Sequence, residues 1–460
     1  MCKVTVYIPT YNYGQYLAQA VDSVLAQTLG DWELIVINDG STDNTSEVLD
    51  AYRDNPQIRI IDQENKGLNV TNNIALRLAR GEYITRLDGD DYMDENLLMI
   101  LSSALDTKPE VALVYPDYYH VDSDGEVIEI VRREKIDDEV QLLDLPAHGA
   151  CTMFRKDLLR EIGGYIEDFS CQDGYELWLR FIRKHKPFNV NLPLFYYRRH
   201  GSNLTEDTAR ILDTRREIKA RFVETYHKDR KPRVLGVILA SAKAVCPEMH
   251  PMAKLNGRPL IWYTLDQAAQ AESLDRVVLS TEDNQTLEYA KQFGTIEAIK
   301  RPDELTGVTV RTCDIVKSII DELQGTRDYR PDAVAVLYAN TPLRKACHID
   351  KAVNTMMIFD VDSVISIQEE LAPCYQHRQF GLTPVNDVTG SLRIERKALY
   401  KENGAVYLTK VEAIESGSLL GKTVGHITML PEESIKINSS FDFWLAQRIM
   451  EQWPGQNQNP

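Results

Sequence analysis

The sequence lacks any apolar stretch approaching the roughly 18–20 residues needed to cross a bilayer. It is also poor in positive charge, because its 460 residues include 69 acidic and 52 basic side chains, a formal net charge of −17. This balance argues against a protein that coats nucleic acid or anionic lipid. The opening MCKVTVYIPTYN is not typical of a signal peptide, because its apolar run is short and β-branched. We therefore expect no membrane span and no nucleic-acid partner.

Cysteine is scarce and scattered, with seven thiols, no Cys-x-x-Cys pair and no zinc-like spacing. Such cysteines are typical of free thiols in a reducing compartment, so we expect a cytoplasmic protein. The glycine patterns G-x-G-x-x-G and G-x-x-x-x-G-K-[ST] are missing from the predicted strand ends. Dinucleotide-binding and Walker-type phosphate loops are therefore unsupported.

What the chain does contain is an alternation of short β-branched apolar runs and longer amphipathic segments. In the first half we expect strands at 4–9, 33–38, 58–62 and 83–87, with helices between them. After a charged stretch at 227–233 the pattern restarts, with strands at 234–239, 277–280, 333–338, 363–367 and 405–408. This predicts an α/β fold with two Rossmann-like nucleotide-binding domains, 1–228 and 232–454, each with a mostly parallel sheet.

Polar and acidic residues follow the predicted strands of the first half. Thr10 and Asn12 follow the first strand, Asp39 follows the second, and Asp88 and Asp90 follow the fourth. The carboxyl ends of parallel strands meet at one edge, where α/β folds bind ligands. A carboxylate at position 39 can accept from a base N–H or a ribose hydroxyl. The two carboxylates that flank Gly89 can point at one divalent cation. Water molecules and phosphate oxygens would complete the coordination shell of that cation.

Other interpretations of these residues stay open. Asp39 and Gly40 also form an ordinary turn, with Ser41 or Asp43 as a helix cap. The acidic run after Leu87 could be a solvated loop before the next helix. A D-x-D nucleophile of the haloacid dehalogenase type needs Thr or Val soon after it, whereas Tyr92 and Met93 stand here.

Six motifs occur in order over residues 3–225: VYIPTYN, VINDGSTDNT, NKGLN, ARGEYITRLDGDDYM, GACTMFRKDLL and CQDGYELWLRF. Together they closely resemble family 2 glycosyltransferases of the GT-A fold. The resemblance implies that Thr10, Asn12 and Asp39 line the nucleotide pocket. It places Asp88 near the ribose or the metal, and Asp90 on Mg²⁺ or Mn²⁺ beneath the diphosphate. The chain has Thr-Asn-Asn at 71–73 where the family often has Ala-Arg-Asn, which leaves the choice of nucleotide open.

Inverting sugar transfer also needs a base that deprotonates the acceptor hydroxyl. The resemblance implies that Asp173 is this catalytic base, with Glu176 as the second candidate. Without the resemblance, Asp173 would be a helix N-cap and Glu176 a surface helix residue. The segment YRRHGSN at 197–203 resembles the family's basic segment near the closing lid. It implies that Arg199 and His200 contact the diphosphate, and the alternative is a solvated turn.

The second half resembles cytidylyltransferases that activate sialic-acid-type sugars, over about residues 233–450. The segments that carry this resemblance are ILASAKAVCPEMHPMAKLNGRPLIWYTL, RPDEL, VLYANTPLR, DSVISI, NGAVYL and IKINSSFDF. In that family an acid sugar attacks the α-phosphate of CTP with the help of a metal. The chain departs from the family at its chemistry: Ser-Ala-Lys at 241–243 replaces a glycine-rich basic loop. Lys436 and Asn438 replace acidic metal ligands, with only Asp442 kept.

Four basic residues of this half are candidates for phosphate contacts: Lys243, Lys254, Arg301 and Arg344. The alternative for each is ordinary surface charge. Two readings of this half follow, since it either binds a nucleotide or sugar without turnover or is a divergent active enzyme. Sialyl-type cytidylyltransferases often dimerise, which points by analogy to a homodimer.

We therefore expect a metal-dependent inverting glycosyltransferase that uses Mg²⁺ or Mn²⁺, a nucleotide-sugar donor and a glycan or glycoconjugate acceptor. We expect it to be fused to a cytidylyltransferase-like domain whose ligands would be CTP and an acid sugar. The alternatives are a bifunctional enzyme with an active second domain, or a sugar-nucleotide-binding scaffold without turnover in that domain.

Overall fold

The chain divides into two units by its internal contacts, Met1–Arg215 and Arg216–Pro460. The computed structural model describes residues 2–132, 149–169, 171–200, 207–243, 247–307, 309–370, 372–379, 381–385 and 399–452. Only the backbone is described for Asp173, Thr326 and Arg327. The division falls within one helix, α7 (Thr208–Tyr226). The domain boundaries expected from the sequence, 1–228 and 232–454, stay predictions.

The first unit alternates strands and helices along its first hundred residues, as its sequence pattern predicts. These elements are β1 (Val4–Thr10), α1 (Gly14–Leu25), β2 (Trp32–Asp39), α2 (Thr45–Asp50), β3 (Ile58–Gln63), α3 (Leu68–Leu78), β4 (Tyr83–Arg86), β5 (Tyr92–Met93) and α4 (Leu97–Thr107). They are followed by β6 (Val111–Val121), β7 (Val127–Val131), β8 (Met153–Arg155), α5 (Lys156–Glu161), α6 (Asp173–Ile182) and β9 (Lys186–Arg198).

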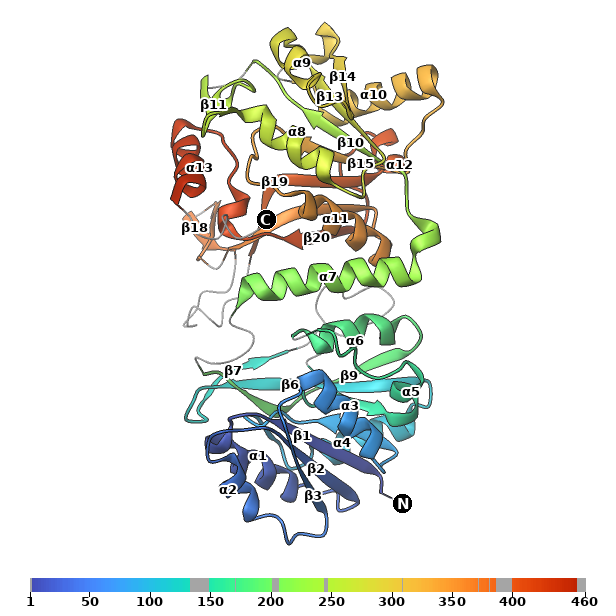
Figure 1. Ribbon diagram of the computed structural model, residues 1–460, viewed down its shortest axis with the longest axis vertical. Coiled ribbons are helices and arrows are strands. Elements are labelled where there is room, and N and C mark those ends of the chain that lie inside the picture. Colours follow the sequence, from blue (N-terminus) through green and yellow to red (C-terminus); the bar gives the residue numbers. More distant parts are fainter. Residues whose placement is uncertain are drawn as a thin grey trace. The chain divides into compact units, whose positions relative to one another are not determined.

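The described strands of this unit form one sheet in the order β3-β2-β1-β4-β8-β6-β9-β5, with β7 paired to β6 (Figure 1). Strands β3, β2, β1 and β4 are parallel, whereas β8 runs antiparallel to both β4 and β6. The sheet is therefore mixed rather than mostly parallel. Alternate residues of β1 enter different core clusters, Val6 and Ile8 in one and Tyr7 in the other. Both faces of the central strands are thus covered, which explains their continuous apolar runs.

Arg198, the last residue of β9, joins several elements of the first unit. Its guanidinium is buried, with 2 % of the residue exposed. Its Nε donates to the backbone oxygen of Asp90 at 3.0 Å, Nη1 to that of Ser123 at 2.9 Å, and Nη2 to Gln19 Oε1 at 2.6 Å. The guanidinium also lies 4.6 Å from the ring centroid of Tyr16. One side chain therefore holds α1, the β6–β7 turn and the acidic turn after β4 together.

The second unit repeats the alternation of strands and helices. Its elements are β10 (Val234–Leu239), β11 (Lys254–Leu255), β12 (Arg258–Pro259), α8 (Leu260–Gln270), β13 (Arg276–Thr281), α9 (Asn284–Ala290), β14 (Ile296–Lys300), α10 (Thr312–Arg327), β15 (Ala333–Tyr338), α11 (Ala346–Phe359), β16 (Ser363–Glu370), β17 (Tyr375–Arg378), β18 (Gly381–Pro384), β19 (Leu399–Lys410), α12 (Val411–Glu415), β20 (Val424–Thr428) and α13 (Ser440–Gln452).

The main sheet of this unit has the order β14-β13-β10-β15-β19-β16-β20 within the described residues (Figure 1). Strands β14, β13, β10 and β15 are parallel, and β19 is antiparallel to its neighbours β15 and β16. The expected pair of α/β domains is confirmed. The strand expected at 405–408 lies within β19, whereas its antiparallel direction and the antiparallel strand β8 were not predicted. Within the described part of the chain, no helix combines the length and apolarity that crossing a membrane requires.

We predict that Arg198→Lys destabilises the first unit by about 2–4 kcal/mol. A lysine ammonium cannot reach the separate acceptors that the planar guanidinium serves, so buried carbonyl oxygens lose their donors. Arg199→Lys is the matched control, because Arg199 is exposed and its change should stay within about 0.5 kcal/mol. Chemical unfolding of the two variants measures the difference. Equal stability of both variants would contradict the role given to Arg198.

Candidate active site

The carboxyl ends of β2, β1 and β4 lie at the same edge of the first sheet. In the parallel register Thr10 pairs with Asn38, and Tyr7 pairs with Arg86. Asp39 and Asp88 therefore follow strands on either side of β1. A Cβ atom at Gly89 would lie 3.0 Å from Thr10 Oγ1, so the acidic turn after β4 passes close to the end of β1. The structure thus brings these predicted site residues together.

The end of β1 is shaped by Thr10 and Asn12. The hydroxyl oxygen of Thr10 is buried and has no hydrogen-bond partner among the described residues. Asn12 has a left-handed backbone, with φ of 59°. Its Oδ1 accepts from the backbone N–H of Thr42 at 2.7 Å, and its own N–H donates to Ser41 Oγ at 2.9 Å. Asn12 therefore ties the loop after β1 to the loop after β2.

Asp39 is buried at the end of β2 and is already held by hydrogen bonds. Its Oδ1 accepts from Gln63 Nε2 at 2.7 Å and from the backbone N–H of Lys66 at 2.8 Å. Its Oδ2 accepts from the backbone N–H of Gly67 at 2.9 Å. These bonds fix the carboxylate against the loop between β3 and α3. A bound nucleotide would have to use the remaining acceptor capacity, mainly that of Oδ2.

Three carboxylates crowd the turn after β4, and each meets a different partner. Asp88 Oδ1 lies 2.8 Å from Arg86 Nε, and Asp90 Oδ2 lies 2.9 Å from His200 Nε2. Asp91 Oδ1 accepts from the backbone N–H of Arg198 at 2.9 Å. The second oxygen of Asp91 is buried without a hydrogen-bond partner among the described residues. Burial, followed by the charges of Asp90 and Asp88, raises the pKa of Asp91 well above its usual range.

The two basic residues expected near the diphosphate have different surroundings. His200 reaches the acidic turn through Asp90 and stacks on Tyr16, with ring centroids 5.4 Å apart. The side chain of Arg199 is exposed, while its backbone N–H donates to the oxygen of Val121 at 2.8 Å. The neighbouring Arg198, which the sequence does not single out, is the arginine that contacts the acidic turn.

The two candidates for the base lie on α6. Asp173 is the first residue of this helix, and its side chain lies outside the described residues. Glu176 is buried and forms an ion pair with Arg180, with a distance of 2.7 Å between Oε2 and Nη2. Arg180 also donates to the backbone oxygens of Ile162 and Gly164. Glu176 therefore serves as a structural partner of an arginine, which weakens its candidacy as the base.

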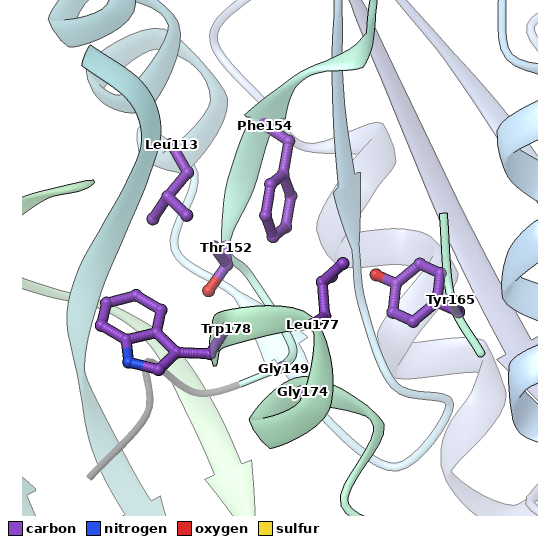
Figure 2. A pocket seen from close by; sticks show the side chains of 8 residues that line it. All are labelled: Leu113, Gly149, Thr152, Phe154, Tyr165, Gly174, Leu177 and Trp178. Atoms are coloured by element: carbon purple, nitrogen blue, oxygen red, sulfur yellow. The ribbon is translucent and has the colours of Figure 1, made fainter. Parts of the chain in front are cut away.

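A cavity of about 10 Å³ lies beside the start of α6, with room for about one water molecule. Figure 2 shows Thr152, Leu177 and Trp178 on its walls. A Cβ atom at Gly174 would lie 3.3 Å from the Cα atom of Gly149, so two backbones approach closely here. The cavity is too small for a sugar and does not extend the candidate site.

In the second unit, the loop after β10 is held by Glu282. Glu282 Oε1 accepts from Ser241 Oγ at 2.6 Å and from the backbone N–H of Ala242 at 2.9 Å. Arg301 is buried beside Glu282 and donates to the backbone oxygen of Ser280 at 2.7 Å. Lys243 is exposed, and its ammonium donates to Thr306 Oγ1 at 2.9 Å. Side-chain hydrogen bonds thus fix residues 241–243, which differ in this from a glycine-rich phosphate loop.

The remaining two predicted phosphate contacts lie in contrasting places. Lys254 is exposed at the start of β11. Arg344 is buried, and its Nη1 donates to the backbone oxygen of Ala405 at 2.7 Å and to Thr341 Oγ1 at 2.9 Å. Its Nε and Nη2 are buried without hydrogen-bond partners among the described residues. Burial lowers the pKa of Arg344 to about 9, so the guanidinium stays charged at neutral pH.

Among the described residues, no group of three or more His, Cys, Asp and Glu side chains is arranged to hold a metal by itself. The six cysteines in this part of the chain are free thiols.

Sequence reasoning missed Arg86, Asp91 and Arg198 as members of the first site. Arg86 could have been found, because it ends β4 and precedes Asp88 by only two residues, which brings a cation close to the acidic turn.

Comparisons with known proteins match each unit to a family. The family model described as Glycosyl transferase family 2 matches residues 5–163, and the one described as Cytidylyltransferase matches residues 249–442. The chondroitin synthase of Escherichia coli is 32 % identical over 211 residues, which cover 44 % of this chain and 29 % of that protein. The hyaluronan synthase of Pasteurella multocida is 40 % identical over 126 residues, which cover 27 % of this chain and 13 % of that protein.

A further curated relative and a solved structure also match. The glycosyltransferase GlyG of Streptococcus pneumoniae is 40 % identical over 126 residues, which cover 26 % of this chain and 41 % of that protein. The chain thus spans less than half the length of these three curated relatives. Among solved structures, residues 1–349 of TarS from S. aureus with UDP-GlcNAc have a TM-score of 0.42 at 18 % identity, covering 48 % of this chain and 66 % of that one.

The two family matches fall on the two α/β units in the expected order, which confirms the resemblances and the fold class inferred from the motifs. The first unit is therefore similar to family 2 glycosyltransferases over residues 5–163, and the second unit is similar to cytidylyltransferases over residues 249–442.

Proposed function

We propose that the first unit is a metal-dependent, inverting glycosyltransferase that moves a sugar from a nucleotide donor to a glycan or glycoconjugate acceptor. The observation that carries this proposal is the convergence of Asp39, Asp88 and Asp90 at the carboxyl ends of adjacent parallel strands. Ligands bind at this edge in open α/β sheets. The names of the relatives, chondroitin synthase and hyaluronan synthase, support a glycan product.

The nucleotide of the donor would lie along the ends of β1 and β2. Asp39 would accept from the base or ribose through its less occupied oxygen. Thr10 supplies a buried hydroxyl without a partner in the described structure, and Asn12 holds the two flanking loops in place. Asp88, fixed by Arg86, would lie at the ribose or metal end of the same pocket.

A divalent cation, Mg²⁺ or Mn²⁺, fits Asp88 and Asp90. Asp90 Oδ1 has no hydrogen-bond partner among the described residues, while Oδ2 faces His200. Two carboxylates suit a hard cation that takes the rest of its shell from phosphate oxygens and water. Bound there, the cation would neutralise charge on the departing diphosphate. His200 and Arg199 are the residues of this chain proposed to contact that diphosphate.

Asp173 is the proposed base. The acceptor hydroxyl oxygen forms its bond to the anomeric carbon while the bond from that carbon to the diphosphate oxygen breaks. The hydroxyl proton passes to the Asp173 carboxylate, and attack opposite the leaving group inverts the anomeric centre. The position of Asp173 at the start of a helix supports this role, because helix N-termini stabilise a carboxylate in its charged form.

For the second unit we propose binding of CTP and an acid sugar, with little or no turnover. The cytidylyltransferase match supports the ligands. The tied loop at 241–243 and the lysine at position 436 favour binding over turnover. The rival proposal is a divergent active enzyme that supplies an activated sugar to the first unit, where fusion would raise its local concentration. A cytoplasmic location and a homodimer remain parts of this proposal.

The donor can be identified by thermal shift of the whole chain with UDP-, GDP-, dTDP- and CMP-sugars, each with and without Mn²⁺. A donor at about 100 times its dissociation constant should add about 2.7 kcal/mol to the stability of the folded protein. We expect one nucleotide class to stabilise the protein strongly, and only when Mn²⁺ is present. Equal stabilisation with and without the metal would contradict a metal-held diphosphate.

We predict that Asp90→Ala abolishes metal-dependent donor hydrolysis and transfer while the fold survives. Loss of this carboxylate removes a proposed ligand to the cation and the oxygen that faces His200 Nε2. Asp124→Ala is the matched control, since Asp124 is exposed in the turn between β6 and β7. Product release at varied Mn²⁺ measures the effect. Full activity of Asp90→Ala would exclude the metal role.

We predict that Asp173→Asn lowers kcat by a factor of about 10²–10⁴ with donor binding largely intact, because the amide cannot accept the acceptor proton. Asp157→Asn in α5 is a control, since Asp157 is exposed. Single-turnover rates and donor dissociation constants separate the two effects. Normal turnover in Asp173→Asn would move the base to another residue.

A further inference from the structure

The carboxyl ends of β10 and β15 are neighbours in the second sheet, with Leu239 paired to Tyr338. Strand β19 runs in the opposite direction beside β15, so its residues 403–405 lie at this same edge. The hydrogen bond from Arg344 to the backbone oxygen of Ala405 confirms this placement, because Arg344 also contacts the oxygen of Tyr338. We call residues 338–344, 403–405 and 435–438 the basic edge.

Lys436 is held in a defined position at the basic edge. The backbone N–H of Ile437 donates to the oxygen of Asn340 at 2.8 Å, and Asn340 Nδ2 donates back to the oxygen of Ile437 at 3.0 Å. The ammonium of Lys436 lies 5.4 Å from the ring centroid of Tyr338. A Cβ atom at Gly404 would lie 2.9 Å from this ammonium, and Gly404 has a left-handed φ of 74°. The glycine thus leaves room for the lysine.

Arg344 is a second cation at the edge where Lys436 lies. Arg344 is buried, and neither it nor Lys436 forms an ion pair within the described part of the chain. A charge withdrawn from water without a counterion is unfavourable, and an anion nearby offsets that cost. The Nε and Nη2 atoms of Arg344 have no hydrogen-bond partner among the described residues, which also favours an anion at this edge.

The carboxylates around this edge are already engaged. Glu402 accepts a hydrogen bond from the hydroxyl of Tyr407. Asp442 Oδ2 accepts from the backbone N–H of Asn438 at 2.9 Å and from Ser439 Oγ at 2.9 Å. These hydrogen bonds hold the two carboxylates in place, and a divalent metal ion beside Lys436 and Arg344 would be repelled by both cations.

We propose that the basic edge binds the phosphates of a nucleoside triphosphate through Lys436, with no divalent cation required. Arg344 acts as a positioning residue that holds the ends of β15 and β19 and adds positive charge, and Lys243 flanks the edge from the loop after β10. This inference rests on the proposal that the second unit binds CTP. It adds that the protein supplies the positive charge that a metal ion would otherwise bring.

The test measures CTP binding to the full chain by calorimetry, in EDTA and in excess Mg²⁺. Asp90→Ala serves as the background, so that the first unit's proposed metal site does not contribute. We expect the dissociation constant to differ by less than about threefold between the two buffers. Lys436→Met should weaken binding about ten- to a hundredfold, the effect of losing one charge-assisted contact.

Two further variants control for folding and for charge. Lys436→Arg keeps the cation and should bind CTP within a few-fold of the background protein. Lys422→Met removes an exposed lysine that precedes β20, at the opposite edge of the sheet, and should leave binding unchanged. Thermal unfolding of each variant verifies that the second unit is folded.

The outcomes distinguish this inference from the proposal that the second unit binds CTP. CTP binding that requires Mg²⁺ would overturn the metal-free site and leave nucleotide binding standing. Unchanged affinity in Lys436→Met would overturn the assignment of Lys436. Absence of CTP binding in both buffers would overturn the proposed function of the second unit, and this inference with it.

Discussion

Crowding of negative charge in the turn after β4 is the constraint on which the first site depends. Asp88, Asp90 and Asp91 occupy four consecutive positions with one glycine, and carboxylates so close repel one another. The structure relieves this repulsion with an arginine for Asp88, an imidazole for Asp90 and burial of Asp91 with a raised pKa. These partners come from β4 and from the end of β9, so the turn has its shape only once the whole sheet is assembled.

The two units use the same strand order at their centres and carry opposite charges at the corresponding edge. In the first, Asp39 ends β2 and the acidic turn follows β4, on either side of β1, where we propose that a cation holds the diphosphate. In the second, Lys436 and Arg344 lie where β15 ends, where we propose that phosphates bind directly. The fold alone therefore does not determine whether such a site needs a metal ion. The residues that follow each strand determine it.

Much of the fold could be predicted from local pattern. Apolar runs at 4–9, 33–38 and 333–338 became β1, β2 and β15 with ends shifted by two residues at most. The antiparallel direction of β19 and the strand β8 could not be predicted, because the pairing joins residues far apart in the chain. The role of Arg198 could not be predicted for the same reason. Its acceptors lie on α1, on the β6–β7 turn and after β4, and no local sequence pattern indicates that arrangement.

Residue type and position in a motif were not enough to assign chemistry even where the motif was found. Glu176 and Asp173 are both acidic residues at the start of α6, yet Arg180 lies one turn after Glu176 and neutralises it. That i, i+4 pair was visible in the sequence and argues against Glu176 as a base. Asp39 shows the converse, since it is in the predicted place but its hydrogen bonds come from Gln63 at the end of the next strand and from Lys66 and Gly67 in the loop after it. An acidic residue is therefore free to react or to bind only to the extent that its neighbours in space leave its oxygens unoccupied, and that depends on the folded chain.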